Sequence, residues 1–179
     1  EVATNYVIIG QKKVHLSVGK MLLLGIMAGM FIALAAVGAN TGASMVPNPG
    51  LAKVVAALIF PAGLAMVILA GSELFTGECL IIISALEKGI SWRAMLKCWF
   101  FVYIGNFIGS IVVAFLMSQC QQFSLFSNGL ALFTIKTALA KTALTPVSAV
   151  ILGIFCNFLV CIAVWIGFAG TTVTEKLAG

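Results

Sequence analysis

The chain has 179 residues, of which 62% are hydrophobic and 8% are charged, and its formal net charge is +5. A soluble domain of this length needs a polar surface that this composition cannot supply, so a soluble enzyme or nucleic-acid-binding domain is excluded. Long uncharged runs approach the ~20 apolar residues needed to cross ~30 Å of hydrocarbon. We therefore predict an all-α integral membrane protein with a single transmembrane domain.

The chain begins with a mixed segment and a first span. Residues 1–19 interleave apolar and basic side chains, and a helix lying flat at the membrane surface is one interpretation. The first span is predicted over about residues 20–39, where Gly25 and Gly29 share a face suited to close helix contact. A Gly- and Pro-containing loop follows over residues 40–50.

The second span carries most of the functional information. Read as one helix, residues 51–86 would be ~54 Å long, which is too long for one crossing. The segment also contains Glu73 and Glu78 at membrane depth. We predict a helix broken near residues 71–77, with a long half before the break and a short half after it. Non-helical backbone at this depth requires surrounding protein or water, and broken helices in transporters mark substrate paths.

Two further spans complete the predicted domain. The third covers about residues 96–117 and carries Gly105 and Gly109 with Asn106 between them. Residues 119–145 contain an apolar stretch that suits a re-entrant or interfacial segment. The fourth span covers about residues 146–167, with Asn157 in its middle.

Three polar residues at the predicted break are candidates for function. Glu73 and Glu78 are interpreted first as groups that bond to backbone N–H groups freed by the break and so hold the loop. Direct handling of protons or substrate remains open, as does exposure to the cytoplasm, for which Glu78 is the better candidate. Thr76 offers a neutral donor before a half-helix whose N-terminus carries partial positive charge. It suits a ligand for an anion or an N-cap, and both roles can hold together.

Apolar and basic residues near the break have two interpretations each. Phe60 and Leu64 share a helix face, and Leu74 and Phe75 flank Thr76, so these side chains suit either constrictions that reject hydrated ions or ordinary packing. Lys141 suits a helix-end charge or an electrostatic lure for anions.

The remaining chemistry-bearing residues favour no cofactor. Asn157 suits helix association or substrate binding. The five cysteines form no C-x-x-C pair and are interpreted as apolar filler, and the single histidine, His15, excludes a bis-histidine haem site. We expect no metal, no cofactor and no enzymatic activity.

The distribution of basic residues predicts orientation in the membrane. Seven lie on the side of the N-terminus, which we place in the cytoplasm, and three lie on the opposite side. The first group is Lys12, Lys13, Lys20, Lys88, Arg93, Lys97 and Lys176, and the second is Lys53, Lys136 and Lys141.

Three segments resemble a known family. Residues 70–77 (AGSELFTG) resemble the helix-two break of the formate/nitrite transporter family, residues 99–110 (WFFVYIGNFIGS) resemble its third helix, and residues 156–165 (CNFLVCIAVW) resemble its fourth. The resemblance implies an aquaporin-like helical bundle, a homopentamer in the cell (inner) membrane and a pore in each protomer. It also implies six spans in two inverted halves. This chain supplies four and lacks the broken fifth helix with its pore histidine, so we expect a truncated chain.

The resemblance implies pore positions for seven residues. They are Leu74, Phe75 and Thr76 at the break, Phe60 and Leu64 at a cytoplasmic-side constriction, Lys141 at the outer vestibule, and Asn157 on the fourth helix.

The predicted function is passive passage of small monovalent anions, namely formate, nitrite or hydrosulfide, with the physiological anion left open. An aquaporin-like channel for water or neutral solutes is an alternative, since Asn48-Pro49-Gly50 superficially resembles that group's N-P-A turn. A membrane anchor subunit of a redox complex is another alternative.

Overall fold

The computed structural model describes residues 2–170 and 172–178, and within those ranges the regular structure is helical. The side chain of Lys176, counted above for membrane orientation, lies outside the described part. The helices in chain order are α1 (Val2–Val14), α2 (Val18–Ala43), α3 (Pro49–Ile59), α4 (Pro61–Ala70), α5 (Phe75–Glu78), η1 (Cys79–Ile81), α6 (Ile82–Leu86), α7 (Trp92–Gln119), η2 (Gln122–Ser124), α8 (Gly129–Thr142), α9 (Pro146–Ala169) and α10 (Val173–Ala178).

Four described segments are long and apolar enough to cross a membrane, namely Val18–Ala43, Pro49–Ala70, Trp92–Gln119 and Pro146–Ala169. Each begins at a polar residue whose side-chain oxygen accepts a hydrogen bond from the backbone N–H three residues later, which satisfies one orphan donor of the first turn. These N-cap residues are Ser17, Asn48, Ser91 and Thr145. The predicted all-helical membrane fold with a broken second helix is confirmed.

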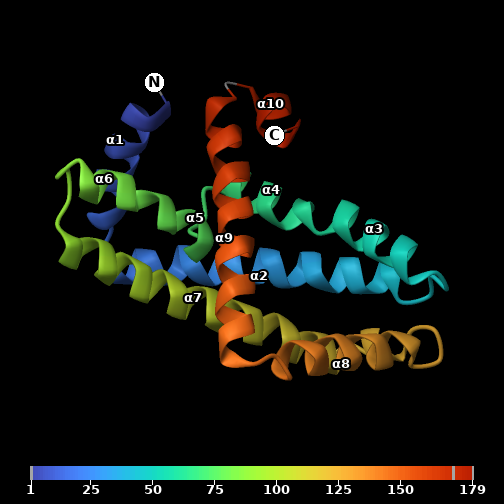
Figure 1. The fold of residues 1–179 in the computed structure, drawn as a ribbon. Coiled ribbons are helices and arrows are strands. Elements are labelled where there is room, and N and C mark those ends of the chain that lie inside the picture. The colour runs from blue at the N-terminus through green and yellow to red at the C-terminus, as the bar shows by residue number, and fades with distance from the viewer. Residues whose placement is uncertain (1, 171, 179) are drawn as a thin grey trace.

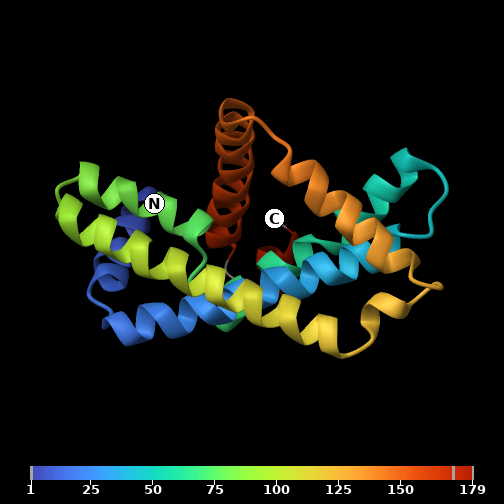
Figure 2. The ribbon, with the colours of Figure 1, turned by 90° about the horizontal axis from the view of Figure 1, so that it is seen from below.

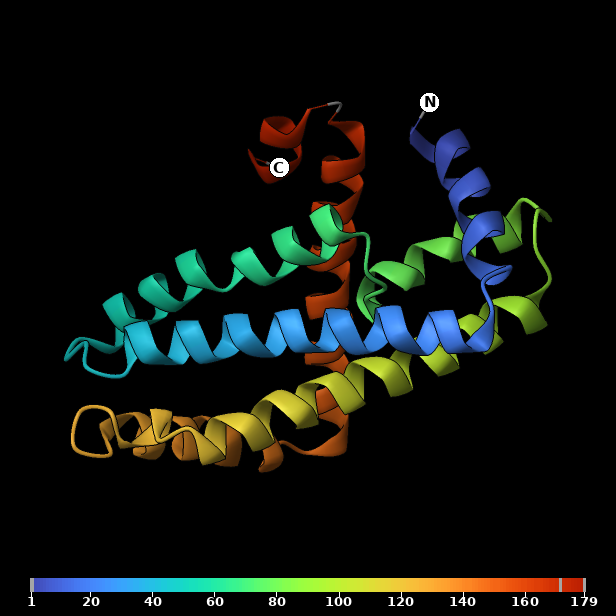
Figure 3. The same cartoon turned by 180° about the vertical axis from the view of Figure 1, so that it is seen from behind.

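Helix α2 forms the centre of the arrangement. It packs between the α3–α4 segment on one side and α7 on the other (Figure 1). Helix α9 runs across these helices and contacts the short helix α5. Viewed from below, α1 and α6 lie at one end of the molecule, whereas the start of α3 and helix α8 lie at the other (Figure 2). The view from behind shows the same separation of the two ends (Figure 3).

Small residues let α2 and α7 approach closely. A Cβ atom added at Gly105 would lie 2.7 Å from the carbonyl oxygen of Leu22, and one added at Gly109 would collide with the carbonyl oxygen of Ile26. Gly25 and Gly29, which belong to α2, face the backbone of α7 in the same way. The two glycine pairs seen in the sequence therefore face one another, as expected for small-residue helix contacts in membranes.

Helix α1 is part of the packed structure. Its Tyr6 is 1% exposed, and the Tyr6 ring stacks on Trp165 and meets the edge of Phe168. The Ser84 hydroxyl of α6 donates a hydrogen bond to the Tyr6 carbonyl at 3.1 Å. Helix α1 is thus docked on the short half of the second span, and its position at the membrane surface stays a prediction.

Candidate functional site

The second span breaks at residues 71–74 because Gly71 adopts a left-handed conformation, with φ of 64°, and ends α4. Glycine populates this region without the steric cost of a Cβ atom. The chain then runs without helical hydrogen bonds to Phe75, where α5 starts. An irregular segment inside a membrane-spanning unit needs other partners for its backbone groups.

Asn106 of α7 supplies several of these partners. Its Nδ2 donates to the Gly25 carbonyl at 2.8 Å and to the Glu73 carbonyl at 2.9 Å, and its Oδ1 accepts from the Phe75 N–H at 2.8 Å. The Glu73 N–H donates to the Leu24 carbonyl of α2 at 3.2 Å. One side chain thus ties the break to both neighbouring helices. In the sequence it stood out only as the residue between two glycines.

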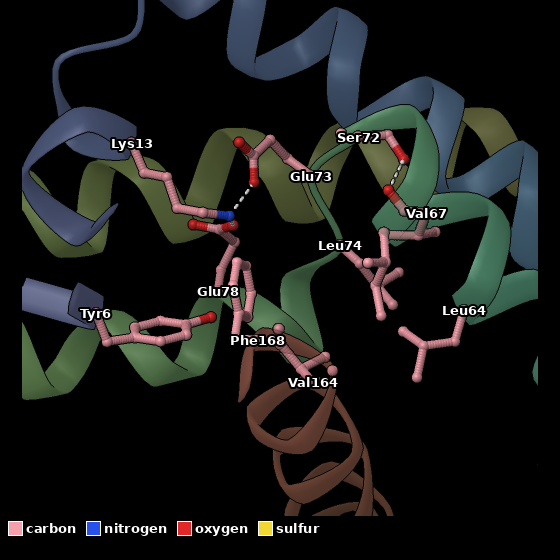
Figure 4. A pocket seen from close by; sticks show the side chains of 14 residues that line it. Tyr6, Lys13, Leu64, Val67, Ser72, Glu73, Leu74, Glu78, Val164 and Phe168 are labelled. Carbon is pink, nitrogen blue, oxygen red and sulfur yellow. Dashed lines mark hydrogen bonds and ion pairs between the residues drawn. The ribbon is translucent and has the colours of Figure 1, made fainter. Parts of the chain in front are cut away.

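A charged cluster lies beside the break. The Lys13 ammonium of α1 forms ion pairs with both Glu73 and Glu78, and Figure 4 shows the three side chains converging. The Glu78 side chain is fully buried, and those of Glu73 and Lys13 are 10% and 19% exposed. Burial lowers the pKa of Lys13, but Glu78 and Glu73 raise it more, so its pKa lies above the usual value. Lys13 is therefore charged.

The glutamates have a different partner from the one expected. We expected bonds to backbone N–H groups, or exposure of Glu78 to the cytoplasm, whereas the structure pairs both carboxylates with Lys13 and buries Glu78. The sequence did contain a signal for a basic partner, because two acidic residues at membrane depth need a counter-charge. Choosing Lys13 from ten basic residues required the fold, because it lies 60 residues from Glu73.

Thr76 stands apart from this network. The N-cap residue of α5 is Leu74, so Thr76 does not cap the helix. Its Oγ1 atom is buried and has no hydrogen-bond partner in the described part of the chain. An unmade hydrogen bond at a buried group costs about 1–3 kcal/mol, so such a group calls for a partner.

Helix α9 approaches the break beside Thr76. The Cys161 thiol donates to the Thr76 carbonyl at 3.3 Å and lies 3.9 Å from the Asn157 Oδ1 atom. Cys79 of η1 also lies next to Asn157. The structure therefore brings Thr76 and Asn157, two predicted pathway residues, into one neighbourhood.

A cavity of about 240 Å³ borders the other side of the break. Leu64 and Leu74 line it together with the Lys13 cluster (Figure 4). Phe75 is not among the residues that line this cavity. Its ring packs edge to face against Tyr103 and Trp99 of α7, with ring centroids 5.3 and 6.2 Å away, respectively. Of the four apolar candidates, Leu64 and Leu74 are thus brought together at the break.

The remaining two candidates lie towards the other end of the molecule. Phe60, at the junction of α3 and α4, borders an apolar cavity of about 420 Å³ between α2, α7 and α8. Lys141 borders a third cavity, of about 490 Å³, between α3 and α8. Phe60 and Leu64 line different cavities of the described chain.

The geometry defines a helical membrane protein whose second span is interrupted by an internally bonded polar break. Comparison with known proteins agrees with this class. The model of the formate/nitrite transporter family matches residues 1–179. The formate channel FocA of Haemophilus influenzae is 39% identical over 154 residues, which cover 85% of this chain and 54% of that protein. FocA of Escherichia coli K12 is 34% identical over 160 residues, covering 88% and 56%.

A solved structure described as an FNT family ion channel superposes with a TM-score of 0.88 at 26% identity, covering 99% of this chain and 71% of that one. The chain therefore belongs to the formate/nitrite transporter family. It spans little more than half the length of the two formate channels that it matches.

Proposed function

We propose that this chain forms the pathway of a passive channel for small monovalent anions such as formate, nitrite or hydrosulfide. One observation supports this most directly: the buried, unpartnered hydroxyl of Thr76 stands at a break whose backbone is otherwise tied to neighbouring helices. A neutral donor can bind an anion in passing without the deep trap that a fixed cation would create.

The surrounding residues have separate proposed roles. Thr76, with Asn157 nearby on α9, forms the polar point of passage. Leu64 and Leu74 form an apolar wall that removes water from the anion, with Phe75 holding the break against α7. Lys141 attracts anions at the opposite end, and Phe60 borders the path between. These steps require no covalent chemistry, so the protein acts as a channel and not as an enzyme.

Glu73 and Glu78 are proposed to hold the loop through Lys13. Two buried carboxylates facing one ammonium leave no surplus positive charge to attract an anion. This cluster consequently anchors α1 and the break, while capture of the substrate occurs elsewhere.

The proposed setting is a homopentamer in the cell membrane with the N-terminus in the cytoplasm. Most of α9 is exposed in the single chain, including Val147, Phe155 and Leu159, and such apolar surface suits lipid or a neighbouring helix. The excess of basic residues on the N-terminal side supports the orientation.

Flux into proteoliposomes tests the proposal. With the protein at its full natural length, stopped-flow light scattering compares a formate salt with glycerol. We expect rapid formate uptake without glycerol uptake, and loss of most formate uptake in Thr76→Val. Glycerol uptake that is insensitive to Thr76→Val would favour a neutral-solute channel and contradict the proposal.

A further inference from the structure

Two thiols from different helices lie at the polar point beside Thr76. Cys79 belongs to η1 and Cys161 to α9, and both are half-buried free cysteines. The Cys79 Sγ atom lies 3.4 Å from the Phe75 carbonyl oxygen, and the Cys161 Sγ atom lies 3.3 Å from the Thr76 carbonyl oxygen. The two thiols therefore donate to the carbonyl groups of adjacent residues at the start of α5.

One side chain of α9 lies next to both thiols. The Asn157 Oδ1 atom lies 3.9 Å from the Cys161 Sγ atom, and Cys79 also lies next to Asn157. The Thr76 hydroxyl of α5 is buried and has no partner in the described part of the chain. Sulfur and oxygen atoms that can ligate a cation thus converge from α5, η1 and α9.

The other three cysteines have different surroundings. The Cys98 thiol donates to the Glu78 carboxylate, and Cys120 lies beside the Met117 thioether. Cys156 is exposed. In the sequence all five cysteines were interpreted as apolar filler, because they form no C-x-x-C pair. The pairing of the two thiols at the break comes from the fold, since they belong to separate spans.

This donor set selects a soft ion of low coordination number. Thiolate ligands favour soft ions such as Cu(I), whereas Mg²⁺ and Ca²⁺ prefer oxygen ligands. A structural zinc site needs four ligands. The described residues contain no group of three or more His, Cys, Asp or Glu side chains that could hold a metal. Two thiols suit the linear, two-coordinate geometry of monovalent Cu(I) and Ag(I).

We propose that Cys79 and Cys161 bind one monovalent soft metal ion, Cu(I) or its analogue Ag(I), beside Thr76 and so block the pathway. On binding, two metal–sulfur bonds form, two S–H bonds break, and both protons leave to solvent without transfer of an electron. Two neutral thiols become one complex with a single negative charge, which repels an anion at this point. The metal site is independent of the proposed function, whereas its effect on flux rests on that function.

Metal binding is tested first on the purified protein, in detergent and without chloride, with Ag(I) as the probe. An excess of a small monothiol removes ions that single cysteines hold, and native mass spectrometry counts the ions that remain. We expect one Ag(I) per chain. Cys79→Ala and Cys161→Ala should each weaken binding more than about a hundredfold, because outer-shell changes alone cost ~10–100-fold. Cys156→Ala, an exposed thiol on the same helix as Cys161, should bind Ag(I) like the parent protein.

Two results would overturn the site. Loss of binding in only one of the two variants would assign the ion to a lone thiol, and unchanged binding in both would exclude these cysteines. A measurement on the parent protein alone guards against variants that fail to fold. Bound Ag(I) should protect Cys79 and Cys161 together from alkylation by iodoacetamide, as read by peptide mass spectrometry, and should leave Cys156 reactive. Alkylation of either paired thiol at the metal-free rate would also reject the site.

Formate uptake by proteoliposomes then tests the block. Loading the parent protein with Ag(I) should lower uptake at least about tenfold, because like charges at close range repel strongly in a medium of low dielectric constant. Cys79→Ala and Cys161→Ala, each compared with its own metal-free rate, should not respond to Ag(I). Ag(I) that is bound without lowering uptake would overturn the block. A metal-free protein that passes no formate would contradict the channel proposal, and the binding results would still decide the metal site.

Discussion

The two ends of this molecule use lysine in opposite ways. At the α1 end, Lys13 is nearly enclosed and held between two glutamates. At the α8 end, Lys53, Lys136 and Lys141 are exposed and have no acidic partner among the described residues. A buried, neutralised charge fixes structure, whereas an exposed, unneutralised charge acts on solutes. Counting lysines in the sequence does not distinguish these two roles, because the roles depend on whether each lysine is buried and whether it has an acidic partner.

Removing a lysine at each end gives the largest expected contrast. Lys13→Met leaves two carboxylates in a buried site without a counter-charge, and breaking a buried pair costs about 3–5 kcal/mol. Lys141→Met, the same replacement at an exposed position, should change stability by less than about 0.5 kcal/mol. Thermal unfolding in detergent, followed by tryptophan fluorescence, measures both. Adding Glu73→Gln and Glu78→Gln to Lys13→Met should restore part of the loss. Equal melting temperatures for the two single variants would contradict the comparison.

The asparagines Asn106 of α7 and Asn157 of α9 provide the next contrast. Asn106→Leu removes the partners of the Glu73 carbonyl and the Phe75 N–H, and each buried group left unpaired costs about 1–3 kcal/mol. Asn157→Leu loses only thiol contacts, with Cys161 and Cys79, so its effect on unfolding should be much smaller. Chemical denaturation of the purified variants gives both values. A larger loss for Asn157→Leu would show that α9, and not α7, holds the break.

The close contact of α2 and α7 should make the stability of the protein sensitive to one added methyl group. Gly109→Ala places a Cβ atom against the Ile26 carbonyl, and overpacking of this kind costs about 1–3 kcal/mol. Gly153→Ala on α9 meets no atom within 4 Å, so it should be neutral or slightly stabilising. The melting temperatures of the two variants measure this difference. Equal decreases would contradict the close packing of α2 against α7.

The smallest expected change in stability is at Thr76. Thr76→Val keeps the shape and removes a hydroxyl that has no partner, so stability should stay within about 0.5 kcal/mol or rise. Formate flux should still fall about tenfold, because a hydrogen bond to a charged group is worth about 1.5–3 kcal/mol. Paired unfolding and uptake measurements on one preparation test this. A fall in stability with unchanged flux would make Thr76 a structural residue.

The sequence was sufficient for features that depend on local patterns. Apolar runs predicted the spans, and the overlong second segment with Glu73 and Glu78 predicted its break. Helical spacing put Gly25 with Gly29, and Gly105 with Gly109, on faces suited to close helix contact, but the fold was needed to show that the two pairs face each other. The partners of buried polar groups were out of reach, because they join residues far apart in the chain. Lys13 meets Glu73 across 60 residues, and Asn106 meets Gly25 across 81. Similarly, only the fold shows that Lys53 and Lys136 line one cavity between α3 and α8.

Formate current across a planar bilayer tests the contrast between the two ends most directly. The protein at its full natural length is inserted in one orientation into an uncharged lipid, and current is compared for formate entering from each side at low ionic strength. The account predicts larger current when formate enters at the Lys141 end, and loss of this asymmetry in Lys141→Gln and at high salt. Equal currents from both sides, or an asymmetry that survives Lys141→Gln, would contradict it.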